Sequence, residues 1–138
     1  MRKVYSKEQF QLAWGYDHAF GLFVQIFDTS ITDDDDLILD CDQGMFSVGT
    51  KNYLTRSKII NVFDKYDFPK AKEEYFHFEA QEFEETYVGY IYNEDGMHDG
   101  KTYIKTMKDY QEFIEKAQQE SKKIEITDIM DQMVYKTT

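Results

Sequence analysis

The carboxylates of this chain are the side chains most able to do chemistry, because they are grouped rather than spread. Seven aspartates and no base lie between Asp28 and Asp42, and eight acids with three lysines lie between Asp64 and Glu85. The stretch between them, residues 43–63, carries three bases and no acid. Charge segregated in this way produces a directional field around a folded protein, and such a field selects partners of opposite charge.

The acidic segments are interleaved with Phe and Tyr, which are residue types enriched at protein interfaces. Carboxylates on a rigid scaffold can also imitate the phosphates of duplex DNA, which carries about one charge per 1.7 Å of axis. The sequence therefore predicts a partner-binding acidic face. Its predicted members are Asp33, Asp34, Asp35, Asp36, Glu73, Glu74, Glu79, Glu82, Glu84 and Glu85.

The formal net charge of −11 restricts the partners of such a face. Nucleic acids and anionic membranes bind through Lys and Arg, so direct binding to either is not expected. A basic protein partner is favoured, such as a nucleic-acid-binding enzyme. In composition the chain is like small, very acidic inhibitors that mimic nucleic acid and are often encoded by phages, an analogy of composition and not of family. The competing interpretation is a solubilising coat without a partner.

The single cysteine, Cys41, is not expected to be catalytic. It lies in an apolar strand pattern, where a free cysteine usually behaves as a small buried hydrophobe. The neighbouring Asp40 and Asp42 would raise the pKa of the thiol, which is the wrong direction for a nucleophile. The histidines that could act as a base are His18, His77 and His98. No serine lies in a nucleophile-elbow context and no glycine pair forms a phosphate-binding loop, so we expect neither an enzyme nor a cofactor.

The aspartates also supply the oxygen ligands that Ca²⁺ and Mg²⁺ take. An EF-hand does not fit, however, because counting back from Gly44 places Leu39 at the first ligand position. Counting back from Gly100 likewise places Met97 at the third. Four consecutive aspartates point in different directions, so residues 33–36 are expected to form a solvated loop and not a metal site.

A second class of function is left open by the aromatic residues. Trp14, Tyr16 and His18, together with a predicted strand over residues 87–92, could line a pocket for a small molecule or a substrate. This alternative would make the chain a ligand-binding or enzymatic α+β domain.

The hydrophobic pattern predicts an α+β fold, with a mostly antiparallel sheet that starts with an N-terminal β-hairpin and packs against two or three helices. Residues 10–16 alternate in polarity and predict a strand, although Ser6 and Gln9 also have the spacing of a helical capping box. Residues 22–27 complete the hairpin, and residues 37–41 predict a third strand.

The remaining segments alternate between helix and strand. A helix is predicted over residues 55–66, capped by Thr55 and stopped by Pro69. Residues 70–84 fit both periods, since Phe76, Ala80 and Phe83 form a helical stripe while Phe76, Phe78 and Ala80 alternate, and the length and the Glu and Lys content favour the helix. Strands follow at 86–92 and 101–105, joined by a loop with two Asp-Gly pairs. A helix over 107–120, capped by Thr106, and short strands at 123–127 and 133–136 complete the chain.

One domain covering residues 1–138 is expected, since no repeat or shift in composition marks a boundary. One cysteine excludes an intramolecular disulfide, and no signal-peptide pattern or membrane-spanning run occurs, so a cytoplasmic location is expected. The predicted core residues are Trp14, Phe23, Ile26, Ile59, Phe63, Val88, Ile91, Tyr110 and Ile114.

Overall fold

The computed structural model describes residues 1–17, 20–98, 100–128 and 133–136, and within them the chain forms eight strands and three helices. It divides into two compact units, unit 1 (Met1–Glu73) and unit 2 (Glu74–Thr138), and each is described by itself. The two antiparallel sheets with their helices confirm the α+β fold class. The single domain over residues 1–138 stays a prediction.

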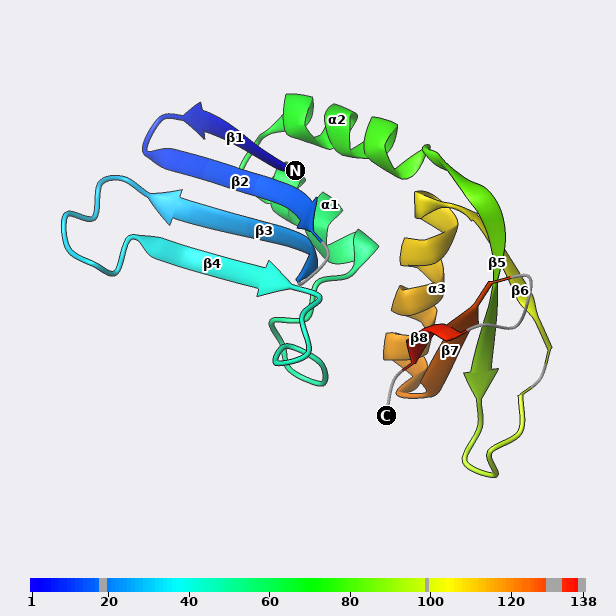
Figure 1. Ribbon diagram of the computed structural model, residues 1–138. Coiled ribbons are helices and arrows are strands. Elements are labelled where there is room, and N and C mark those ends of the chain that lie inside the picture. Colours follow the sequence, from blue (N-terminus) through cyan, green and yellow to red (C-terminus); the bar gives the residue numbers. More distant parts are fainter. Residues whose placement is uncertain (18–19, 99, 129–132, 137–138) are drawn as a thin grey trace. The chain divides into compact units, whose positions relative to one another are not determined.

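Unit 1 contains a four-stranded antiparallel sheet, sheet A, in the order β1-β2-β3-β4 (Figure 1). Its strands are β1 (Arg2–Lys7), β2 (Phe10–Asp17), β3 (Gly21–Asp28) and β4 (Leu37–Asp42). The predicted hairpin is the β2–β3 pair, which is confirmed by the register Leu12↔Ile26. The sequence pattern missed β1, because its residues are exposed except for the half-buried Tyr5 and show no apolar alternation.

The first helix, α1 (Arg56–Lys65), begins where it was predicted. The side chain of Thr55 caps it by accepting a hydrogen bond from the backbone N–H of Lys58 at 3.3 Å. Pro69 does not merely end a helix: it is the first residue of α2 (Pro69–Glu79), a position that tolerates proline because no helical N–H bond is needed there. The helix predicted over residues 70–84 therefore starts one residue earlier and ends at Glu79.

Unit 2 contains a second antiparallel sheet, sheet B, in the order β6-β5-β7-β8. Its strands are β5 (Glu82–Tyr92), β6 (Thr102–Thr106), β7 (Lys123–Thr127) and β8 (Met133–Lys136). Helix α3 (Met107–Glu120) lies beside the sheet in Figure 1. Thr106 caps α3 through a complete capping box with Asp109, so the predicted cap and both helix ends are confirmed.

All nine predicted core residues are at least half-buried, and six of them are buried. Trp14, Ile26, Ile59, Phe63, Val88 and Ile114 are buried, and the rings of Trp14 and Phe63 pack edge to face at 6.2 Å. Phe23, Ile91 and Tyr110 are only half-buried. Phe23 cannot share a face with Ile26 three residues later on a strand, where side chains alternate, and Leu22 and Val24 are buried instead.

Candidate functional site

The aspartate run lies in the connection between β3 and β4, as predicted. Asp33, Asp34 and Asp35 are exposed, whereas Asp36 is half-buried. The carboxylate of Asp33 accepts a hydrogen bond from the backbone N–H of Asp35 at 2.9 Å, and the carbonyl of Asp36 accepts one from Asp28 at 2.8 Å. One hydrogen bond therefore closes the base of the loop and another stabilises the turn at Asp33, and three carboxylates lie at the surface.

The acids of α2 are divided by the face of the helix on which they lie. Glu73 is exposed and Glu74 is half-buried, but Glu79 is buried, with 4% of its surface exposed. Ala71, Tyr75 and Glu79 follow each other at four-residue steps and form one buried stripe of the helix. This stripe replaces the predicted one, and Glu79 presents no carboxylate at the surface.

The three remaining glutamates lie at the start of β5, where the strand is irregular. Glu82 pairs with Thr106 and Tyr87 pairs with Ile104, so four residues of β5 bulge against a single residue of β6. Glu82, Glu84 and Glu85 are all exposed. The bulge allows the adjacent Glu84 and Glu85 to face solvent together, which a regular half-buried strand would not.

Tyr87 lies close to two of these glutamates, Glu84 and Glu85. Burial raises the pKa of Tyr87 most, followed by the charge of Glu85, a hydrogen bond to Glu85, and the charges of Asp128 and Glu84. The ring of Tyr87 packs edge to face on Phe83 at 5.4 Å, and Phe83 packs on Tyr110 at 6.5 Å. We call this group the acidic–aromatic cluster: Phe83, Glu84, Glu85, Tyr87, Tyr110 and Asp128.

The predicted acidic face is distributed over both units. Asp33–Asp36 and Glu73 belong to unit 1, whereas the glutamates from Glu74 onwards belong to unit 2. Unit 1 contains twelve acids and nine bases, a net charge of −3, and unit 2 contains fifteen acids and seven bases, a net charge of −8. The two acidic surfaces are therefore considered separately, and their belonging to one footprint stays a prediction.

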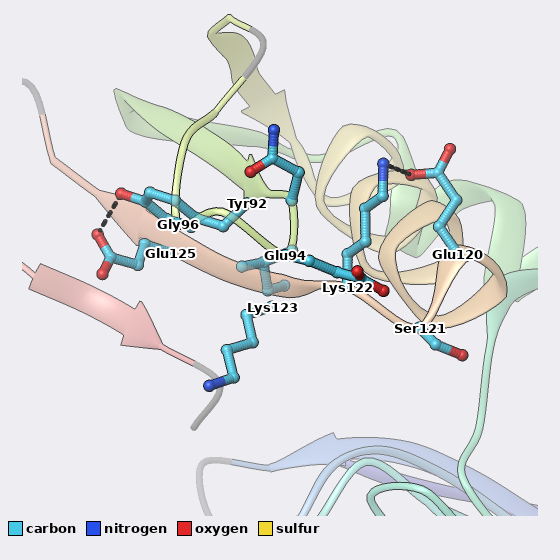
Figure 2. Close-up of a pocket in the computed structure, with 10 residues that line it drawn as sticks. Tyr92, Glu94, Gly96, Glu120, Ser121, Lys122, Lys123 and Glu125 are labelled. Carbon is cyan, nitrogen blue, oxygen red and sulfur yellow. Dashed lines mark hydrogen bonds and ion pairs between the residues drawn. The ribbon is translucent and has the colours of Figure 1, made fainter.

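A hollow of about 650 Å³ lies in unit 2 (Figure 2). Most of the residues that line it are of polar or charged types, and the lining consists of Tyr92, Asn93, Glu94, Gly96, Glu120, Ser121, Lys122, Lys123, Ile124 and Glu125. The Tyr92 hydroxyl donates a hydrogen bond to the Glu125 carboxylate at 2.9 Å, and this bond is the main cause of a raised pKa of Tyr92. The ammonium of Lys122 lies 3.8 Å from the Glu120 carboxylate, while Lys123 extends away from both pairs.

The predicted aromatic pocket stays a prediction, because its residues belong to both units and one of them lies outside the described residues. Trp14 is completely buried, so it cannot line an open pocket. Tyr16 is half-buried, and burial, followed by the charge of Asp17, raises its pKa. His18 lies outside the described residues, and the strand over residues 87–92 belongs to unit 2.

Cys41 is 4% exposed, and burial is the main cause of the raised pKa of its thiol. Asp40 and Asp42 raise this pKa further, as predicted, although the ammonium of Lys58 opposes them. His77 and His98 are exposed, and the His98 ring packs on Tyr90 at 4.8 Å. Among the described residues, no group of three or more His, Cys, Asp or Glu side chains is arranged to hold a metal ion.

The sequence reasoning missed an exposed apolar loop after β4. Met45, Phe46 and Val48 have 79%, 92% and 47% of their surface exposed. The Asp42 carboxylate holds the loop by accepting hydrogen bonds from Gly44 N at 2.9 Å and Ser47 Oγ at 2.7 Å. The sequence did contain a signal for this loop. Its apolar residues lie between Gly44 and Gly49 in the acid-free stretch and follow neither a helical nor a strand period.

Comparison with known protein families, sequences and structures identifies no relative of this chain. No family model, no curated protein and no solved structure matches this chain. Across the part of the chain that the structure describes, none of the helices has the length and apolar character needed to span a membrane.

Proposed function

We propose that this chain is a non-enzymatic protein-binding module whose acidic surface docks on a basic partner protein. The observation that supports this most is the acidic–aromatic cluster of unit 2. Its bulge exposes Glu84 and Glu85 side by side, next to partly buried Phe and Tyr rings. Such a surface offers charge for recognition and rings for contact area.

The exposed acids of both predicted segments are available to a partner. Glu82, Glu84 and Glu85 form no ion pair with any base among the described residues, and the same holds for Asp33, Asp34 and Asp35. Carboxylates without a nearby base are not neutralised within the protein, so their field can accelerate encounter with a basic surface. The excess of acids over bases in unit 2 strengthens that field.

In its sharpest form, the proposed module is a phage-type inhibitor that mimics nucleic acid. Its partner would then be a nucleic-acid-handling enzyme whose basic channel normally holds phosphates. The acids of β5 and of the Asp33–Asp36 loop would occupy phosphate positions, and the rings would occupy positions of bases or sugars.

The experiment is capture of partners by the immobilised full chain from a bacterial lysate at about 0.05 M and about 0.5 M salt, followed by elution with duplex DNA. A genuine mimic should release its partner to DNA and lose it at high salt, since screening shortens electrostatic reach to a few ångströms. The test variant replaces Glu82, Glu84 and Glu85 with Gln. The control variant carries Glu94→Gln, Asp95→Asn and Glu112→Gln, an equal charge change at exposed positions of the same unit.

The proposal expects at least about a tenfold loss of the captured partner for the test variant and no comparable loss for the control, because rim charges act through local complementarity. Replacing Asp33–Asp36 with Asn should add to the loss if both segments share one footprint. Capture that survives both sets of substitutions, or that is indifferent to salt, would show that the acidity only solubilises the chain.

A second candidate function is binding of a small polar molecule in the hollow of Figure 2. The volume of about 650 Å³ favours it, since ligand sites commonly measure about 300–1,000 Å³. Most of the residues that line it are charged or polar, however, whereas hydrophobic and aromatic residues line most such sites, and Tyr92 is already paired with Glu125. A thermal-shift panel of metabolites distinguishes the candidates: stabilisation that disappears with Glu94→Gln or Lys123→Ala would favour the small-molecule function.

A further inference from the structure

A cavity of about 330 Å³ lies on unit 1, on the face of sheet A opposite to Trp14. The strand registers place Arg2, Gly15, Phe23 and Asp42 in one row across the sheet. The next row on that face contains Gln25 and Asp40. The cavity is lined by Arg2, Asp17, Phe20, Phe23, Gln25, Asp40 and Asp42.

Gly15 shapes this cavity by supplying no side chain to its row. A Cβ at Gly15 would lie 2.8 Å from the tip of the Phe23 ring, so the ring lies across the glycine. The guanidinium of Arg2 lies above the same ring, 5.8 Å from its centroid, and donates a hydrogen bond to Gln25 Oε1 at 3.0 Å. The face is therefore already built around one guanidinium on an aromatic ring.

The cavity contains more negative charge than this one cation neutralises. Three carboxylates line it, and Asp40 and Asp42 form no ion pair with a base among the described residues. Arg2 bonds to the neutral amide of Gln25, whose own N–H donates to Asp40 Oδ1 at 3.3 Å. The Phe20 ring, 52% exposed, forms a second apolar wall near Asp17, whose carboxylate accepts the Phe20 N–H at 2.6 Å.

We propose that this cavity binds a second guanidinium group, with Asp40 and Asp42 as its acceptors and the exposed ring of Phe20 as its apolar wall, beside the Phe23 ring that Arg2 already covers. Guanidinium combines a planar face for stacking with donors for carboxylates, and an ammonium lacks the planar face. The group could come from an arginine on a protein surface or from a free small molecule. The inference does not rest on the proposed function, because the cluster in unit 2 takes no part in it.

The probe is N-acetyl-argininamide, titrated into the full chain and followed by backbone amide NMR shifts around Phe23 and Asp40. Its control is N-acetyl-citrullinamide, which has nearly the same shape without the charge. Only the arginine probe should bind. A twelve-residue peptide with one central arginine distinguishes the sources: tighter binding than the amide indicates a protein arginine, and equal binding indicates a free guanidinium ligand.

Matched variants separate a local site from a general field. Asp40→Asn should weaken the affinity for the arginine probe at least about fivefold, as expected for loss of one charge-assisted hydrogen bond. Asp34→Asn removes the same charge from the exposed loop and should change this affinity little. Arg2→Ala removes the resident cation and should tighten binding. Equal losses for Asp40→Asn and Asp34→Asn, or equal binding of the citrulline probe, would overturn the proposal. Circular dichroism of each variant confirms that the fold is retained.

Discussion

Units 1 and 2 have the same general construction, a four-stranded antiparallel sheet accompanied by helix, but they carry different charge. Unit 1 is nearly balanced at −3, and unit 2 has a net charge of −8. Both have buried apolar residues, among them Trp14 and Phe63 in unit 1 and Phe113 and Ile126 in unit 2. The excess acidity is thus a property of the surface of unit 2 and is not required by this architecture.

The largest expected effects come from truncating the two cores separately. Phe63→Ala in unit 1 should cost about 3–5 kcal/mol and Ile114→Ala in unit 2 about 2–5 kcal/mol, since each leaves a cavity. Urea unfolding can follow unit 1 by the fluorescence of Trp14 and unit 2 by the methyl NMR signal of Ile126. Phe46→Ala, at a side chain 92% exposed, is the control and should change stability by about 0.5 kcal/mol or less.

The two probes also test the division of the chain. If each truncation moves only the transition of its own unit, the units unfold independently. Coincident shifts of both probes would support the predicted single domain, because one cooperative body unfolds as a whole.

A glycine in each sheet gives the next largest difference. A Cβ at Gly89 would lie 2.6 Å from the ring of Phe113, which is buried, so Gly89→Ala should overpack unit 2 at a cost of about 1–3 kcal/mol. At Gly15 the Cβ would meet the carbonyl of Met1 at 2.0 Å and the tip of the Phe23 ring at 2.8 Å, but the exposed terminal Met1 and the half-buried Phe23 can move aside more easily than the buried Phe113. Urea melts should therefore show a smaller cost for Gly15→Ala, and the reverse order would contradict this comparison.

The helix caps predict a smaller contrast of about 1 kcal/mol. Thr106 forms a reciprocal capping box with Asp109, whereas Thr55 only accepts one bond, from Lys58. Thr106→Ala should therefore lower the stability of unit 2 more than Thr55→Ala lowers that of unit 1. Ser at either position should restore most of the loss, and equal effects of the two alanine variants would argue against a contribution of the box.

The smallest predicted effect appears in alkali and concerns Tyr92. Its hydrogen bond to Glu125 raises the pKa of Tyr92 in the folded chain above the ordinary value of about 10. The folded chain then holds the phenolic proton more tightly than the unfolded chain does. The resulting stabilisation is complete below pH of about 10 and is lost as the pH rises through the folded pKa. Tyr92→Phe should flatten the decline of unit 2 stability between pH 9 and pH 11, measured by urea melts, and an unchanged slope would contradict the linkage.

The sequence predicted the elements that carry a clear period or cap. Apolar patterns typical of strands predicted β2, β3 and β4, and a capping residue with a helical period predicted the helix from Met107 to Glu120. β1 was missed because strand pairing with β2 gives it its structure, and its own side chains carry no apolar alternation. The end of α2 was misplaced because residues 76–84 satisfy both the helical and the strand period.

The candidate site was predicted less completely than the fold. Exposure of Asp33–Asp35, Glu84 and Glu85 follows from the cost of burying unpaired charge. Glu79 broke that rule, since its position in line with Ala71 and Tyr75 became visible only when the helix face was known. The bulge of β5 depends on its pairing with β6, whose residues are distant in the sequence, so the local sequence of β5 could not predict it.

The buried thiol of Cys41 makes unit 1 chemically observable on its own. Reagents such as iodoacetamide or a disulfide dye react with the thiolate, and both burial and a raised pKa keep that species scarce at the surface. Alkylation at Cys41 therefore proceeds through opening of β4 and its neighbours, so its rate reports the frequency of that opening. Because the chain has no other cysteine, mass spectrometry of intact protein can count opening events in one half of the molecule while the other half is left unlabelled.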